Sequence, residues 1–129
     1  MSPALAEPDD VVWTQALCRP IVDARAGLGA IDAARCEKCG DYGIGLSMHH
    51  RKKRGQGGSW APSNIVVVCG DGTRGCHGWI EQNPTAANAE GWHLTTGDPD
   101  GSVVPIRHWQ IKWCRVKLDD LGNLHPISW

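Results

Sequence analysis

Two sets of metal-binding side chains alternate along the middle of this chain. One set is four cysteines, and the other is made of imidazoles and an amide. Thiolates favour a structural zinc ion, whereas imidazoles can also ligate a catalytic ion or accept a proton from water. The alternation therefore indicates two sites with different tasks. In chain order the residues are Cys36, Cys39, His49, His50, Asn64, Cys69, Cys76 and His77.

The four cysteines have the spacing of a structural zinc site. Two residues separate Cys36 from Cys39, and the turn between them lets both thiolates point at one ion. The loop from Cys69 to Cys76 is wider, but its three glycines make it pliable enough to complete a tetrahedral set. Chance placement or free core thiols would also account for four cysteines. Two pairs that flank one histidine motif favour zinc.

Two polar residues further along the chain support the adjacent histidines as part of a site. His49 and His50 are neighbours at the end of a predicted strand, so their side chains leave on opposite faces and can serve different tasks. Adjacent histidines alone are common on surfaces. Asn64, which precedes the next predicted strand, and His77, in the predicted helix after it, favour a site over coincidence. By itself, Asn64 would be interpreted as an ordinary turn residue.

The elements that must position these residues can be predicted from local patterns. Residues 44–50 are predicted to form a short strand, and the β-branched run 65–68 a buried one. Glycines and a proline in residues 55–63 favour an irregular loop between them. Residues 76–83 should form a helix that Pro84 stops. The predicted order around the histidines is strand, loop, strand, helix.

The remaining segments carry weaker signals. Residues 1–10 are predicted to be a flexible tail. A helix should begin near Arg19 or Pro20, or one turn of helix earlier, and end at Gly27 and Gly29. Toward the C-terminus we predict a short helical turn at 85–90, a hairpin of 92–95 with 102–106, and a second hairpin in which 109–118 is followed by the turn 119–123.

Length and composition bound the fold. The 129 residues fit one domain, which we place at 11–129, with a β-rich extension over 92–129. Phe is absent and Gly numbers 16, so the core is thin and a bound metal would help to hold it. We expect a small α+β domain with an N-terminal helix, the four-cysteine zinc site and C-terminal β-hairpins.

The expected compartment is the cytoplasm. The N-terminus lacks the profile of a signal peptide, and no apolar run is long enough to cross a membrane. Reducing conditions keep thiols free for metal. Three disulfides would be the alternative only in a secreted protein.

The segment from Cys36 to Glu81 resembles the HNH, or ββα-metal, endonuclease family, in its zinc-stapled form from phages and bacteria. The motifs that carry the resemblance span roughly a third of the chain, and residues 69–79 are similar to phage members. The resemblance implies a ββα-metal core at about 44–83 and a DNA-hydrolysing activity. It also implies double-stranded DNA as substrate, action in the host cytoplasm and, by association, a role in genome packaging beside a phage terminase, in homing or in defence.

The resemblance also implies a role for each residue of the motif. His49 and His77 would ligate a catalytic divalent ion, His50 would be the general base, and Asn64 would orient the base and pin the loop. Relatives often have a second helical histidine where this chain has Glu81. A carboxylate there favours Mg2+ or Mn2+, with Ni2+ and Zn2+ as alternatives. A solvated surface glutamate is an equally good interpretation of Glu81.

A basic run comes directly after the two histidines. Net charge is −1, which argues against nonspecific binding of DNA by the whole surface, but local clusters can still neutralise phosphates. The predicted DNA-binding residues are Arg51, Lys52, Lys53 and Arg54. The rival interpretation of the whole chain is a zinc-stabilised module that binds nucleic acid or protein without catalysis.

Overall fold

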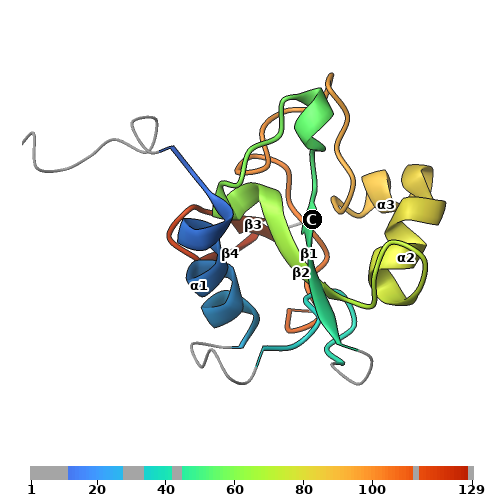
Figure 1. The fold of residues 1–129 in the computed structure, drawn as a ribbon, viewed down its shortest axis with the longest axis horizontal. Coiled ribbons are helices and arrows are strands. Elements are labelled where there is room, and N and C mark those ends of the chain that lie inside the picture. Colours follow the sequence, from blue (N-terminus) through green and yellow to red (C-terminus); the bar gives the residue numbers. More distant parts are fainter. Residues whose placement is uncertain (1–11, 28–33, 42–44, 112–113, 128–129) are drawn as a thin grey trace, which may run out of the picture.

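The computed structural model describes residues 12–27, 34–41, 45–111 and 114–127. Within them the fold is α+β, as predicted (Figure 1). The tail 1–10, Gly29 and the first residue of the predicted strand at 44 lie outside the described residues. No helix in the described ranges has the length and apolar character needed to span a membrane. The helices and strands are α1 (Gln15–Ala26), β1 (Leu46–His50), β2 (Ile65–Cys69), α2 (Gly75–Gln82), α3 (Pro84–Ala89), β3 (Arg115–Leu118) and β4 (Leu124–Ile127).

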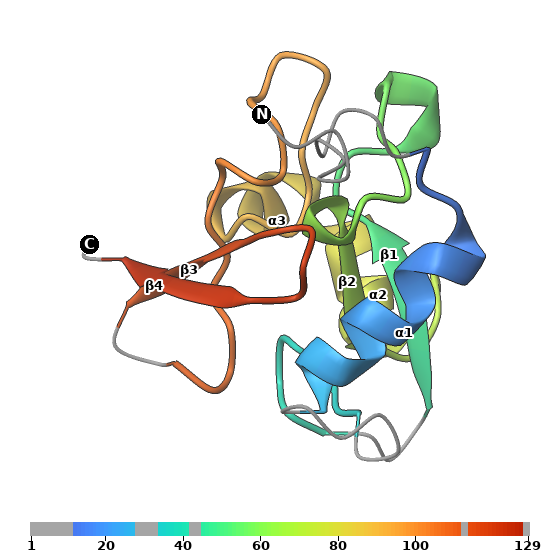
Figure 2. The same ribbon diagram turned by 90° about the vertical axis from the view of Figure 1, so that its left-hand side faces the viewer.

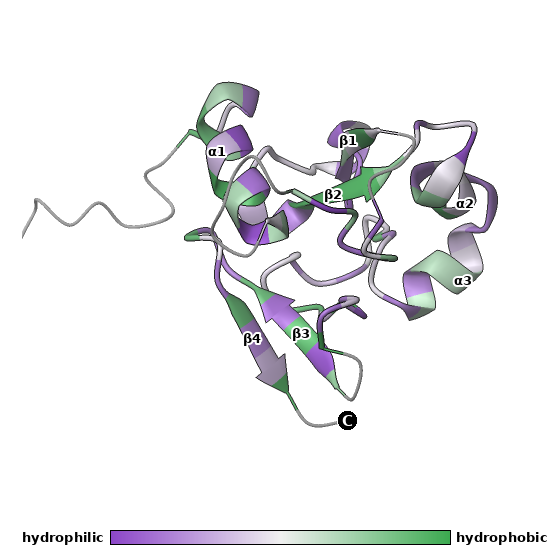
Figure 3. Ribbon diagram, turned by 90° about the horizontal axis from the view of Figure 1, so that it is seen from below, coloured by the Kyte–Doolittle hydropathy of each residue, from purple (hydrophilic) through white to green (hydrophobic). Residues whose placement is uncertain are grey.

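The antiparallel pair β1–β2 lies between α1 on one side and α2 with α3 on the other (Figure 1). Every residue of β2 is buried, because its alternating side chains enter two different cores. Ile65 and Val67 pack in a cluster with residues of α1, whereas Val66 and Val68 pack with Ile80 of α2 and with residues beyond it. This two-sided burial explains the unbroken apolar run, which is green in Figure 3.

Helix α1 begins at Gln15, one turn before Arg19. The helix includes the preceding turn that the sequence allowed before Arg19, because Thr14 caps it and the Thr14 hydroxyl accepts the N–H of Leu17 at 3.2 Å. Pro20 therefore lies inside α1. The predicted end is confirmed, since Gly27 is the C-terminal cap.

The region after β2 agrees closely with the prediction. Asn83 separates α2 from α3, and Pro84 occupies the first turn of α3, where its missing N–H does no harm. Pro84 thus stops one helix and begins the next. The loop between β1 and β2 is less irregular than expected, because it contains two short 3-10 turns, Arg54–Gln56 and Pro62–Asn64.

Of the two predicted C-terminal hairpins, the structure contains the second, as β3–β4, which projects to one side in Figure 2. Its first strand begins at Arg115, so residues 109–111 of the predicted strand lie outside it, and residues 112–113 lie outside the described ranges. The predicted pairing of 92–95 with 102–106 is wrong. Leu94 instead donates its N–H to the carbonyl of Arg51 at 2.7 Å, and Ile106 exchanges two backbone hydrogen bonds with Val116. Leu94 therefore pairs with a residue far away in sequence, and Ile106 pairs with the first strand of the following hairpin.

A buried ionic network joins α1 to β2. Both carboxylate oxygens of Glu37 accept from Arg25, at 2.7 and 2.9 Å, and Glu37 also accepts the backbone N–H of Val67 at 2.9 Å. His108 lies 3.2 Å from the same carboxylate. Burial raises the pKa of Glu37, but the Arg25 charge and the hydrogen bonds outweigh it, so the pKa falls to about 2. Glu37 is therefore ionised although no part of it is exposed.

Candidate metal centres

The four predicted zinc ligands converge from three segments. Cys36 and Cys39 lie in a turn that the N–H of Gly40 closes on the carbonyl of Cys36 at 2.8 Å, Cys69 ends β2, and Cys76 lies in the first turn of α2. Their sulfurs lie within 4.8 Å of one another, and those of Cys39 and Cys69 are 3.8 Å apart. Tetrahedral zinc with bonds of about 2.3 Å needs sulfurs roughly 3.8 Å apart. The cluster therefore fits a zinc ion.

The surroundings of these sulfurs favour a thiolate at Cys36, whereas burial raises the pKa of Cys39. A hydrogen bond from Cys76 lowers the pKa of Cys36 to about 5, and the same bond raises the pKa of Cys76. Backbone N–H groups also point at sulfur: that of Cys39 donates to Cys36 at 3.4 Å, and that of Cys76 donates to Cys69 at 3.3 Å. Negative charge on sulfur is what a metal ion requires.

Removing the zinc should unfold the centre of the protein, because metal-binding energy contributes directly to folding here. We expect one zinc per chain by elemental analysis, and Cys39→Ser should lose that zinc together with the cooperative thermal transition. Cys114→Ser, which changes a cysteine outside the quartet, should keep both. A zinc-free wild-type protein with an unchanged transition would contradict a structural zinc site.

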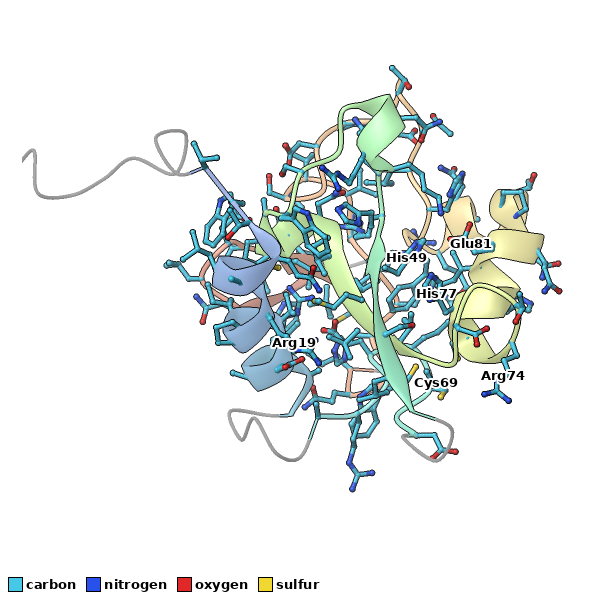
Figure 4. The ribbon with its side chains drawn as sticks, in the orientation of Figure 1. Arg19, His49, Cys69, Arg74, His77 and Glu81 are labelled. Carbon is cyan, nitrogen blue, oxygen red and sulfur yellow. The ribbon has the colours of Figure 1, made fainter. Side chains whose placement is uncertain are left out.

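A second cluster lies between β1 and α2, where Figure 4 shows His49, His77 and Glu81 pointing toward one another. Glu81 Oε2 lies 3.5 Å from His49 Nδ1 and 3.6 Å from His77 Nε2. The remaining ring nitrogens have partners of their own. His49 Nε2 donates to the carbonyl of Trp92 at 2.9 Å, and His77 Nδ1 lies 2.7 Å from the hydroxyl of Ser47. These contacts turn one nitrogen of each ring toward the cluster.

The electrostatics of this cluster suit metal ligands. Burial lowers the pKa of His49 to about 4 and also lowers the pKa of His77, so both rings are neutral near pH 7. Burial raises the pKa of Glu81, but the hydrogen bond and charge of Lys53 outweigh it and the net pKa is lowered. Two neutral imidazoles and one carboxylate fit a divalent ion.

His50, the predicted general base, faces away from that cluster. Its ring meets Trp60 edge to face with centroids 4.4 Å apart, and Nε2 is buried without a hydrogen-bond partner among the described residues. Burial, followed by the charges of Arg54 and Lys53, lowers the pKa of His50. The ring is therefore neutral near pH 7, and Nδ1 is the nitrogen left to exchange protons.

Asn64 holds the loop between β1 and β2. Its Oδ1 accepts the N–H of Lys52 at 2.9 Å, while Nδ2 donates to the carbonyls of Lys52 at 3.0 Å and Ser59 at 2.9 Å. The Asn64 carbonyl accepts the N–H of Arg51 at 2.8 Å. Asn64 thus fixes the backbone directly after His50, because it binds main-chain groups of the residues that follow His50 in the loop.

Arg51 departs from its predicted role in DNA binding. Its side chain is fully buried and its guanidinium donates to four backbone carbonyls at 2.6 to 2.9 Å. Burial lowers the pKa of Arg51 to about 9, which still leaves it charged near pH 7. Arg51 therefore organises the chain and does not meet phosphate. The accepting carbonyls belong to Ser63, Gly91, Gly101 and Val104.

The other basic residues differ among themselves. Lys52 donates to the carbonyl of Asp98 at 2.9 Å, Lys53 contacts Glu81, and Arg54 is exposed.

The sequence interpretation also missed Ser47, the partner of His77. Its position two residues before His49, on the same strand face, was a usable signal.

Comparison with known proteins adds no relative: the chain matches no protein-family model, no curated protein and no solved structure. The case for function therefore depends on the two clusters and on the elements that hold them.

Proposed function

We propose that this protein is a metal-dependent endonuclease of the HNH type that hydrolyses phosphodiester bonds in DNA. The observation that supports it is the cluster of His49, His77 and Glu81 between β1 and α2, with ligand atoms within 4.8 Å of one another. His50 adjoins it on the same strand. In this proposal β1, β2 and α2 are the ββα-metal core, and the cysteine zinc braces it.

Each residue then has a task. His49, His77 and Glu81 would hold a divalent ion, whose charge would polarise the scissile phosphate and stabilise the leaving oxygen. His50 takes a proton from the attacking water at Nδ1 as the new phosphorus–oxygen bond forms and the old one breaks. Asn64 acts as a positioning residue, because it fixes the backbone immediately after His50.

In this proposal the basic residues that remain accessible contact double-stranded DNA. Arg54 is exposed, and the side chains of Lys52 and Lys53 lie partly at the surface. Charges of this kind neutralise phosphates without reading bases. We therefore propose that these residues bind DNA with little sequence preference, and that the affinity for DNA falls markedly as the salt concentration rises.

The test is cleavage of supercoiled plasmid by the zinc-loaded protein in the presence of Mg2+, Mn2+, Ni2+, Zn2+ or a chelator of divalent ions. We expect nicked or linear products, with Mg2+ and Mn2+ more effective than Zn2+ because Glu81 supplies a hard oxygen. Plasmid that is bound and retarded but remains intact with every ion would favour the non-catalytic module instead.

A further inference from the structure

Lys53 shares an atom with the candidate ion site. Its ammonium contacts Glu81 Oε2, the oxygen that also lies 3.5 Å from His49 Nδ1 and 3.6 Å from His77 Nε2. In this arrangement Oε2 is the carboxylate oxygen that faces both imidazoles, and therefore the one that an ion held by the three side chains would contact first. Lys53 and the ion are both positive, so they cannot occupy the same contact without strong repulsion. The geometry makes them competitors for Glu81.

The backbone of Lys53 is fixed while its side chain can move. Its carbonyl accepts the N–H groups of Gln56 and Gly58, both at 2.9 Å, and Asn64 holds the preceding residue on both sides. The side chain of Lys53 is 39% exposed, and the four-carbon stem of a lysine is flexible. The ammonium can therefore leave Glu81 without disturbing the loop.

Lys53 also lies where it can serve both halves of the proposed site. Its charge acts on His49 and His77 on one side and on His50 on the other. A phosphate that bridges the ion and the general base must pass between these groups. A lysine released there has a phosphate within reach, and phosphate is a natural partner for an ammonium.

We propose that Lys53 exchanges partners: a divalent ion takes Glu81 from it, and the freed ammonium then binds the DNA backbone. This inference rests on the proposed function and adds a coupling between the ion and the substrate. Ion binding alone must displace Lys53, whereas ion binding with DNA present gives the displaced ammonium a new partner. DNA should therefore tighten ion binding. By reciprocity, the ion should tighten DNA binding by the same factor.

Calorimetric titration of Mn2+ into zinc-loaded protein tests the competition without cleavage. Lys53→Ala should bind Mn2+ more tightly than the wild type, on the order of tenfold. The matched control is Arg54→Ala, which removes an equal charge one residue later without touching Glu81; its affinity should match that of the wild type. Equal affinities for Lys53→Ala and the wild type, or equal gains in both variants, would overturn the exchange. Absence of Mn2+ binding in all three proteins would instead overturn the proposed ion site itself.

A second titration tests the exchange onto DNA. In a His50→Ala background, which strongly slows cleavage, a short duplex should tighten Mn2+ binding by about tenfold. In the double variant His50→Ala/Lys53→Ala the duplex should have a markedly smaller effect. The same tightening in both backgrounds would show that Lys53 does not carry the coupling.

Discussion

Replacing His50 with alanine should lower the rate of DNA cleavage by roughly two to four orders of magnitude, the usual contribution of a general base. The side chain accounts for none of the described hydrogen bonds of the fold, and its Nε2 has no partner. The variant should therefore keep its zinc, its thermal transition and its affinity for DNA. Single-turnover cleavage at saturating Mn2+ measures the chemical step directly.

The matched control is His125→Ala, because His125 pairs with Asp119 at 2.7 Å in the β3–β4 hairpin, away from the cluster. That variant should cleave DNA at the wild-type rate. A folded His50→Ala protein that cleaves as fast as His125→Ala would exclude His50 as the base.

Glu37→Ala should destabilise the zinc-loaded protein by about 3 to 5 kcal/mol, the usual effect of removing one partner of a buried ion pair. The loss leaves the guanidinium of Arg25 in the core without its carboxylate partner, and the N–H of Val67 loses its acceptor. Unfolding in urea, followed by Trp fluorescence, gives the change in free energy.

Asp23→Ala is the control for Glu37, because it removes a carboxylate from a surface pair. Asp23 lies 3.4 Å from Arg19, whose side chain is 63% exposed. That change should cost no more than about 1 kcal/mol. Equal urea midpoints for the two variants would show that the buried network does not stabilise the fold.

Local spacing was enough to predict the cysteine quartet, whereas the grouping of His49 and His77 followed from the resemblance to the HNH family. Cys36 and Cys39 share one turn, and one helical turn separates His77 from Glu81, so short-range geometry brings each pair together. The antiparallel pairing of β1 with β2, and the packing of α2 beside β2, then place His49 near His77 and Glu81. The α+β class, β1, β2, α2 and the second hairpin were predicted from equally local patterns.

The roles within the basic run could not be predicted from sequence. Arg51 and Lys53 look alike there, yet one is buried and the other reaches Glu81. Residues 91–104 make the difference, because three of their backbone carbonyls accept hydrogen bonds from Arg51. Leu94 binds the distant backbone of Arg51, and Ile106 pairs with Val116 of the next hairpin, so the predicted hairpin does not form. Such contacts depend on the assembled fold.

The central claim is that the ion held by His49, His77 and Glu81 is the one used for cleavage, and the dependence of the cleavage rate on Mn2+ concentration tests it most directly. In His77→Ala the half-saturating Mn2+ concentration should rise by more than about tenfold, because a ligand has been removed. Zinc content and the urea midpoint should stay near those of the wild type. An unchanged half-saturating concentration, with cleavage intact, would contradict the claim.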